Sequence, residues 1–186
     1  MSRRAAAAAE TRRRIVDATR ALHTEQGIAA TSWDQIAARA GVGVGTVYRH
    51  FPTLDELVPA CGEVSMGIVA FPADPAALFD GLATPAERLG RLASEAFAIY
   101  ERASGELRVA RREPDAHPSV AAFAAASETA LAELVGAALA PFEAGDDDRA
   151  LVRALVDLDT WEALRAAGVA DPAAAVTELL ATRLSR

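Results

Sequence analysis

Four neighbouring side chains near the N-terminus have the chemistry to contact DNA: those of Thr46, Tyr48, Arg49 and His50. Hydroxyl and imidazole groups can donate hydrogen bonds to phosphate oxygens, and an arginine can form a bidentate pair with guanine. They lie within residues 31–51, TSWDQIAARAGVGVGTVYRHF, which we predict to form two short helices joined by a glycine turn. A rigid helix that exposes such side chains, with a supporting helix set across it, suits the major groove of DNA.

Local signals position these side chains. Ser32 and Gln35 fit a capping box at the start of the first short helix, and Gly41 stands where that helix should stop, because glycine readily adopts a left-handed backbone. Apolar residues fall on the opposite side from the polar ones: Ile36, Ala37, Ala40, Val42, Val47 and Phe51. The alternative is a helical hairpin that merely packs, but such a hairpin has no need of Tyr, Arg and His exposed together.

The same segment resembles the DNA-binding end of TetR-family transcriptional regulators. The family pattern is a Thr-Thr or Thr-Ser start, an Ile-Ala pair, Ala-Gly-Val, and then Gly-Thr-hydrophobic-Tyr-x-His/Tyr-Phe. This chain supplies Thr31-Ser32, Ile36-Ala37, Ala40-Gly41-Val42 and Gly45-Thr46-Val47-Tyr48-Arg49-His50-Phe51. The resemblance implies that a segment starting at Val44 and Gly45 and ending at His50 enters the major groove.

The resemblance also implies separate roles for the residues of this predicted site. Thr46, Tyr48 and His50 would contact mainly phosphates, whereas Arg49 occupies the variable position and would read a base. Thr31 and Ser32 would donate hydrogen bonds to phosphates beside the first short helix of the pair.

Three departures from the family pattern lower the expected DNA affinity. Val44 stands where Lys is common, Gly43 replaces the usual Ser cap, and Thr53-Leu54 replaces a frequent Ser-Lys. The cluster at residues 12–14 is either a solvated run of charge or a set of phosphate contacts that compensates for these losses.

Composition and periodicity predict an all-α protein, since alanine is abundant and few stretches alternate as strands do. We expect an N-terminal three-helix helix-turn-helix domain over residues 1–52, with residues 1–9 as a flexible arm. The rest of the chain, residues 53–186, is expected to form a helical domain for ligand binding and dimerisation. Helices are predicted near residues 10–26, 85–103, 118–140, 147–167 and 172–184, and Pro59 predicts a kink or break in the helix that opens near residue 53.

Charge is unevenly distributed along a chain whose net charge is −7. Residues 1–52 hold eight arginines and four acidic residues, a balance of +4, and the remaining residues have a balance of −11. A basic end on an acidic body suits a protein that contacts phosphates at one place only.

Other classes of function find little support. Three histidines and one cysteine, Cys61, give no metal-ligand spacing, and no glycine-rich phosphate loop follows a strand, so we expect neither an enzyme nor a cofactor. No run of 18 apolar residues indicates a membrane span, and a single cysteine suits the reducing cytoplasm.

The C-terminal part of the chain carries the predictions about partners. The segment 147–167 is apolar on more than one face, which favours either a homodimer interface, as the resemblance implies, or a thick monomer core. The resemblance also implies a pocket for an unknown small-molecule effector. Aromatic residues expected to face the interior are its candidate lining or else plain core: Phe97, Tyr100, Phe123 and Trp161.

These observations predict a ligand-responsive regulator, more often a repressor than an activator, that binds a double-stranded inverted-repeat operator as a homodimer. The alternative is a TetR-like small-molecule-binding or interaction module whose DNA binding is weak or lost.

Overall fold

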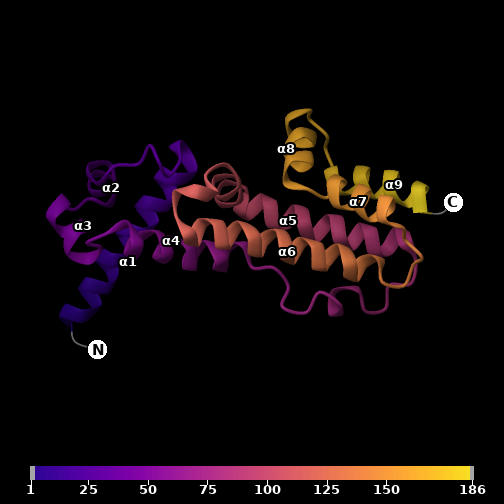
Figure 1. The fold of residues 1–186 in the computed structure, drawn as a ribbon, viewed down its shortest axis with the longest axis horizontal. Coiled ribbons are helices and arrows are strands. Elements are labelled where there is room, and N and C mark those ends of the chain that lie inside the picture. Colours follow the sequence, from indigo (N-terminus) through magenta and orange to yellow (C-terminus); the bar gives the residue numbers. More distant parts are fainter. Residues whose placement is uncertain (1–2, 185–186) are drawn as a thin grey trace. The chain divides into compact units, whose positions relative to one another are not determined.

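The computed structural model describes residues 3–184, and these residues form helices and loops without a strand. The all-α prediction is therefore confirmed. Figure 1 shows the element order, which begins with the helix-turn-helix region. The α-helices are α1 (Arg3–Gln26), α2 (Trp33–Ala40), α3 (Val44–His50), α4 (Leu54–Val69), α5 (Pro85–Arg112), α6 (Pro118–Leu139), α7 (Asp146–Leu155), α8 (Leu158–Ala166) and α9 (Pro172–Leu184), with short 3-10 turns at Ala77–Phe79 and Pro114–Ala116.

The chain packs as two compact units. Unit 1 holds the residues up to Ile68 together with Gly105–Ala125, and unit 2 holds Val69–Ser104 together with the residues from Ala126 onward. The predicted domain boundary, between residues 52 and 53, lies between α3 and α4 and does not coincide with a division between the two units. Packing places α4 with α1, because Leu57 and Cys61 of α4 are buried in the same cluster as Ile15 of α1. The boundary of the functional domains remains a prediction.

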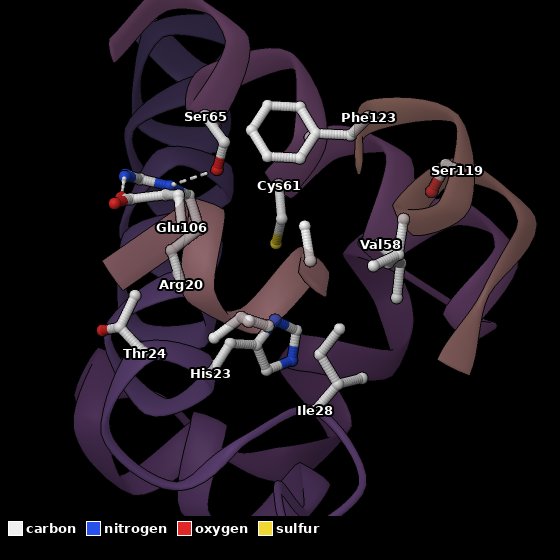
Figure 2. A pocket seen from close by; sticks show the side chains of 14 residues that line it. Arg20, His23, Thr24, Ile28, Val58, Cys61, Ser65, Glu106, Ser119 and Phe123 are labelled. Atoms are coloured by element: carbon white, nitrogen blue, oxygen red, sulfur yellow. Dashed lines mark hydrogen bonds and ion pairs between the residues drawn. The ribbon is translucent and has the colours of Figure 1, made fainter. Parts of the chain in front are cut away.

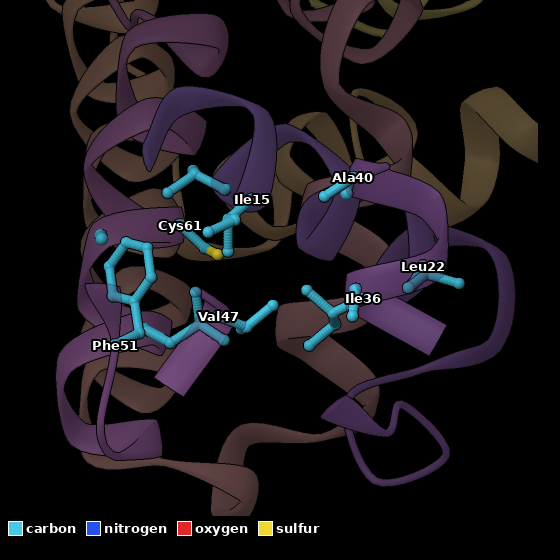
Figure 3. Close-up of a cluster of buried hydrophobic side chains, with 12 residues drawn as sticks. Ile15, Leu22, Ile36, Ala40, Val47, Phe51 and Cys61 are labelled. Atoms are coloured by element: carbon cyan, nitrogen blue, oxygen red, sulfur yellow. The ribbon is translucent and has the colours of Figure 1, made fainter. Parts of the chain in front are cut away.

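The core of unit 1 is built from short apolar contacts between α1, α2, α3 and α4. Figure 3 shows these side chains meeting between the four helices. Ile15, Val47 and Phe51 are fully buried at its centre, and Trp33 and Val42 pack against its edge. Burying such side chains is the main source of stability for a small helical unit.

Helix α1 begins at Arg3, well before the predicted start near residue 10. The prediction of a flexible arm is therefore wrong for residues 3–9, while residues 1–2 lie outside the described part of the chain. The cause is the alanine run of residues 5–9, since alanine has the highest intrinsic helix propensity and no side-chain entropy to lose. These residues extend the helix although their side chains are exposed.

Two further helix predictions need correction. The predicted break at Pro59 is wrong, because α4 continues through this residue although a proline cannot donate a backbone hydrogen bond to the preceding turn; the alternative, a kink there, remains a prediction. Helix α5 runs past Gly105 to Arg112 instead of ending near residue 103. A single glycine in a helix costs only about 1 kcal/mol relative to alanine, which the packing of a long helix can offset.

The predicted helix over 147–167 is divided into α7 and α8 by Val156 and Asp157. The Asp157 side chain is the N-cap of α8 and accepts from the backbone N–H of Asp159 at 3.0 Å. The Val156 carbonyl accepts a hydrogen bond from the Tyr100 hydroxyl at 2.9 Å. An N-cap aspartate can start a new helix wherever tertiary contacts satisfy the carbonyl that precedes it.

In unit 2 a buried arginine joins three segments through backbone carbonyls. The Arg88 guanidinium donates to Phe79 O and Leu82 O at 3.0 Å, to Ala138 O at 2.9 Å and to Ala137 O at 2.7 Å. Its side chain is 8% exposed and also lies over the Phe79 ring. Arg88 thus satisfies carbonyls at the C-terminal end of α6 and in the loop before α5 that would otherwise be buried without partners.

Among the helices of residues 3–184, α6 is the one that is long and apolar enough to cross a membrane, judged by length and composition alone. Alanine accounts for most of its apolar character, and Glu128 and Glu133 interrupt the run. Its C-terminal carbonyls are bonded to Arg88 as in a packed helical bundle. The expectation of no membrane partner remains a prediction.

Candidate DNA-binding surface

The turn between α2 and α3 is fixed at both ends of α2. At its start the predicted capping box is confirmed: Gln35 N donates to Ser32 Oγ at 3.3 Å, and Ser32 N donates to Gln35 Oε1 at 2.8 Å. At its end Gly41 adopts a left-handed backbone with φ of 65°, which a residue with a Cβ rarely adopts. Val42 N then donates to Ala37 O at 3.0 Å and closes the helix end.

Helix α3 has an apolar inner side and a polar outer side, as its sequence predicts. Val47 and the following Phe51 have no exposed surface, whereas Tyr48 is 45% exposed and Arg49 is also exposed. Val44 is 36% exposed. Gly45 is exposed, and Thr46 and His50 are half-buried.

Arg49 is the cation of α3 that remains available for an external partner. It makes no hydrogen bond or ion pair with any other residue within the described residues 3–184. On neighbouring α2, by contrast, Arg39 is bonded to Glu25 of α1 at 2.5 Å. An exposed and unpaired guanidinium on the outer side of a short helix can approach a base edge without first breaking a bond.

Tyr48 is held by a contact that the sequence did not predict. Its ring lies 4.9 Å from that of Trp33, the first residue of α2, with 34° between the ring planes. Such offset aromatic pairs contribute about 0.5–1.5 kcal/mol beyond the area they bury. The contact orders the phenol ring on the outer surface and joins the start of α2 to the middle of α3.

The other polar residues of the predicted site differ in how free their side chains are. The Thr31 hydroxyl donates to Gly27 O at 2.8 Å, and the Ser32 hydroxyl donates to Gln35 Oε1 at 3.0 Å. Both hydroxyls therefore have internal partners before any phosphate approaches, although Ser32 is exposed.

The three arginines at residues 12–14 each have an intramolecular contact. The Arg12 guanidinium lies 4.6 Å from the centre of the Phe51 ring, Arg13 pairs with Glu10 at 2.7 Å, and Arg14 donates to Ala40 O and Gly41 O at the end of α2. All three remain exposed, so phosphate contact stays a prediction. Their contacts show that this run of charge also holds α1 against the helix-turn-helix.

Side chains of the segment 105–125 make polar contacts with α1, with the turn after it and with the start of α4, all inside unit 1. Glu106 pairs with Arg20, Glu113 accepts from Ile28 N at 3.2 Å and from Ala29 N at 2.8 Å, and His117 Nε2 lies 3.1 Å from Asp55 Oδ1. Sequence reasoning missed all of them, because each joins residues at least 60 positions apart and no local pattern marks them.

The candidate pocket aromatics fall into two different places. Phe97, Tyr100 and Trp161 are buried in unit 2, with ring centres 6.1 Å apart for the first pair and 6.0 Å for Tyr100 and Trp161. Phe123 lies in unit 1, where it lines a cavity that also contains His23 and Cys61. The assignment of these four residues to a ligand pocket remains a prediction.

Within residues 3–184 no three His, Cys, Asp or Glu side chains come together in a geometry that could hold a metal ion. The only cysteine, Cys61, is buried, and this burial raises the pKa of its thiol to about 12. A thiol that is so reluctant to ionise is a weak nucleophile at neutral pH.

Comparisons with known proteins agree with this geometry at the N-terminal end. Residues 15–61 match the family described as bacterial regulatory proteins, tetR family. Over 81 residues the chain is 44% identical to the transcriptional repressor KstR of Mycolicibacterium smegmatis, which covers 43% of this chain and 38% of KstR. Over 52 residues it is 50% identical to the transcriptional regulator SrpR of Pseudomonas putida, covering 27% of this chain and 24% of SrpR. The matched stretches thus span less than half of these curated relatives.

Solved structures extend the likeness over nearly the whole chain. The multidrug binding protein EbrR, solved in complex with imidazole, aligns with a TM-score of 0.55 and 29% identity over 93% of both chains. The putative transcriptional regulator SCO7518 of Streptomyces coelicolor aligns with a TM-score of 0.58 over 95% of this chain and 99% of that one. At 22% identity this second match shows the fold alone.

A helix-turn-helix with an outward-facing recognition helix, followed by further helices, defines an all-α protein of the regulator class. The residues that match the family description include α2, α3 and the start of α4. The N-terminal part of the chain, residues 15–61, thus matches the tetR family of bacterial regulatory proteins.

Proposed function

We propose that this protein is a ligand-responsive transcriptional repressor that binds an inverted-repeat DNA operator as a homodimer in the cytoplasm. The observation that carries the proposal is the two-sided character of α3. Val47 and Phe51 fix it to the core of unit 1, while Tyr48 and the unpaired Arg49 face outward. A helix fixed in this way can present side chains to the major groove with little loss of conformational entropy on binding.

The contacts on α3 suggest a division of roles. Arg49 is the candidate for reading a base, since a bidentate arginine–guanine pair discriminates by about 1–3 kcal/mol. Tyr48, Thr46 and His50 are candidates for phosphate contacts, which set the position of a protein on DNA without reading its sequence. Val44, where the family often has Lys, presents an exposed apolar side chain that suits the methyl group of a thymine.

Charge supports contact at this end of the chain. The excess of arginine within residues 1–52 favours phosphates, and the acidic remainder of the chain repels them. Binding should therefore be confined to the helix-turn-helix region and should weaken steeply as salt is added, because each phosphate contact releases a bound cation.

The homodimer rests on the resemblance to the family and on the exposed apolar surface of unit 2. Leu179 of α9 is 63% exposed and Leu151 of α7 is 38% exposed. These exposed fractions are high for large apolar side chains on the surface of a monomer. Two copies joined by C-terminal helices could place two α3 helices about 34–36 Å apart, one turn of DNA.

Ligand response is proposed from the relatives' descriptions and from the packing of unit 2. KstR is described as a repressor, and EbrR as a multidrug binding protein that holds imidazole in its crystal. In this chain the buried cluster of Phe97, Tyr100 and Trp161 is one candidate lining. A ligand changes DNA affinity only if it binds one conformation of the protein better than another.

Selection of DNA from a random pool, followed by titration of the recovered site at several salt concentrations, tests the proposal. We expect one inverted-repeat motif, a stoichiometry of two chains per site, and a steep negative dependence of affinity on salt. Recovery of no motif, together with weak binding that is equal on all sequences, would contradict it.

A second candidate is a TetR-like ligand-binding module that no longer binds DNA well. Two observations favour it: Val44 replaces a common Lys, and Gly43 caps α3 without any side-chain hydrogen bond. The same selection separates the two functions, since this module would retain ligand binding while showing no preferred DNA site.

A further inference from the structure

Unit 1 contains a partly open cavity of about 60 Å³. Its walls come from α1, α4, the last turns of α5 and the first turns of α6. Figure 2 shows Cys61, His23 and Phe123 around the same hollow. A volume of this size has room for about four to six water molecules, so it admits only a very small ligand.

Most of the wall is apolar, with Ile28 on one side and Val58, Val120 and Phe123 on the others. The charged groups in the wall neutralise each other, since Arg20 pairs with Glu106 and each of these side chains is only 14% exposed. The Ser65 hydroxyl accepts from Arg20 at 3.3 Å, and the Thr24 hydroxyl donates to Ala21 O at 2.9 Å. Such a lining offers no unpaired charge for an ionic ligand.

His23 is the polar group of this wall that lacks a hydrogen-bond partner. Its side chain is 9% exposed, and neither ring nitrogen forms a hydrogen bond within residues 3–184. Burial lowers the pKa of this imidazole to about 4, against the opposite effect of the nearby Glu113 carboxylate. At neutral pH the ring is therefore uncharged and carries one free donor and one free acceptor.

Among residues 3–184 no fully buried side-chain nitrogen or oxygen lacks a partner, so the unbonded ring nitrogens of His23 reach the space of the cavity, where a ligand group can bond to them in place of water. The apolar wall favours a ligand body without charge, and the volume favours one ring. We propose that this cavity binds a neutral, single-ring ligand whose one hydroxyl or N–H group hydrogen-bonds to His23 while its ring packs against Val58, Val120 and Phe123.

Position gives this site a direct route to the DNA-binding surface. A ligand there would touch His23 and Thr24 of α1 and Val58, Cys61 and Gly62 of α4. Both helices also contribute to the core on which α3 rests, through Ile15 and Leu57. Ligand binding would therefore favour one spacing of α1 and α4, and this effect on DNA affinity, unlike the binding itself, rests on the proposed function.

Phenol and benzene are the probes that test the site, because they differ only in the hydroxyl group. We expect saturable, one-to-one binding of phenol to the full chain by two-dimensional NMR, with shifts centred on residues of the cavity wall. Benzene should bind at least tenfold more weakly. Absence of saturable phenol binding, or shifts confined to other parts of the chain, would overturn the proposal.

The His23→Phe variant removes the hydrogen bond and keeps a ring of similar size. It should weaken phenol binding at least tenfold and leave benzene binding nearly unchanged, so that the two probes become equal. An unchanged preference for phenol would show that His23 does not hold the hydroxyl.

A second pair of variants tests the location without touching His23. Gly62 lines the cavity, and a Cβ built on it meets no atom within 4 Å, so Gly62→Leu can place a side chain in the hollow. Gly67 of the same helix is equally unobstructed and is not part of the wall, which makes Gly67→Leu the matched control. Gly62→Leu should abolish phenol binding and Gly67→Leu should leave it intact; equal effects would refute the site.

Phenol binding is measured without DNA, so the two proposals can fail separately. A chain that binds its operator but not phenol loses this site and keeps the proposed function. A chain that binds phenol but selects no DNA keeps the site and loses the function.

Discussion

Arg49 has no intramolecular partner among the described residues, whereas the neighbouring arginines of unit 1 are bound to other groups of the protein. Arg39 is bonded to Glu25, Arg14 donates to the end of α2, and Arg12 lies over the Phe51 ring. These bonds fix α1, α2 and α3 relative to one another within unit 1. Arg49 makes no such bond among the described residues, which leaves its guanidinium for an external partner.

Replacing Arg49 with Ala should relax sequence preference more than it lowers overall affinity. The expected loss on the selected operator is about 1–3 kcal/mol, from the removal of one bidentate base contact, with a smaller loss on unrelated DNA. Competition binding with single-base operator variants measures it. An equal loss on every sequence would reassign Arg49 to a phosphate.

His23 should make stability depend on pH. Its pKa is about 4 in the folded protein, below its usual value of 6.5, because burial disfavours the charged ring. Between pH 6.5 and pH 4 the His23 ring is protonated in the unfolded chain but remains neutral in the folded chain. The free energy of unfolding therefore falls as the pH drops toward 4, and His23 does not affect it above about pH 7. The full effect is of the order of 3 kcal/mol.

Urea denaturation of the protein and of His23→Phe between pH 4 and pH 8 checks this prediction. The charged groups near His23 are Arg20, Glu106 and Glu113, and they are present in both proteins. The free energy of unfolding should fall less between pH 7 and pH 4 in the variant than in the parent protein. Parallel curves would show that His23 titrates normally.

At the scale of elements, single side chains join helices and loops that are distant in sequence. Arg88 binds four carbonyls from the loop before α5 and the end of α6. Glu113 binds two backbone N–H groups of the turn after α1. Gly27 in that turn has a φ of 92°, and a Cβ built there would lie 2.2 Å from Glu113 Oε1. The turn therefore requires a glycine for both its backbone and its neighbour.

Arg88→Met should lower the free energy of unfolding by more than about 3 kcal/mol, because it leaves several buried carbonyls without donors. Arg88→Lys should recover little, since one ammonium group cannot reproduce the planar set of donors. Arg91→Met, an exposed position on the same helix, is the control and should change stability by less than about 0.5 kcal/mol. Thermal and urea unfolding measure both, and equal effects would contradict this role.

Glu113→Ala should destabilise the turn after α1 by about 1.5–3 kcal/mol, the value of one hydrogen bond to a charged acceptor, because water can replace part of the pair at this half-buried site. Amide hydrogen exchange at Ile28 and Ala29 should accelerate selectively. Glu101→Ala, at an exposed position of α5, serves as the comparison and should leave that exchange unchanged. No change at Ile28 in the Glu113 variant would show that water replaces the carboxylate fully.

Local chemistry explains which elements could be predicted from the sequence. The Ser32–Gln35 capping box, the stop at Gly41 and the start of α9 after Asp171 depend on residues within four positions of each other. Val47 and Phe51 were assigned to the core from helical spacing alone. Patterns of this kind act over one or two helical turns, so they can be read directly.

Contacts between distant residues could not be predicted in the same way. The pairing of Tyr48 with Trp33, the carbonyls bound by Arg88 and the two N–H groups bound by Glu113 depend on how helices pack. The division between α7 and α8 was missed because its satisfying partner, Tyr100, lies 56 positions away. The cavity around His23 was missed for the same reason, since its walls come from four helices.

At the scale of the whole molecule, the proposed function depends on assembly. An inverted-repeat operator requires two copies of α3 related by a two-fold axis, and nothing in a single chain supplies the second copy. The exposed leucines of α7 and α9 are the apolar surface that a second copy would cover. Their burial would remove surface that a soluble monomer rarely exposes.

Leu179→Glu should shift the protein from dimer to monomer and reduce operator affinity by at least tenfold. A buried carboxylate at a two-fold interface lies near its own copy and is poorly solvated. Sedimentation velocity at micromolar concentration measures the shift, with phenol binding in unit 1 as the internal control for folding. A monomeric parent protein would exclude the dimer and with it the operator geometry.

The buried thiol of Cys61 should not react with thiol-directed labels. With a pKa near 12, roughly one thiol in 100,000 is ionised at pH 7, so maleimide dyes should spare it. A cysteine introduced at the exposed Ala38 of α2 would then be the sole reactive position. In a dimer labelled on both chains, energy transfer between the two fluorophores would report the separation of the two α2–α3 segments with and without DNA. The rest of the protein would keep its native sequence.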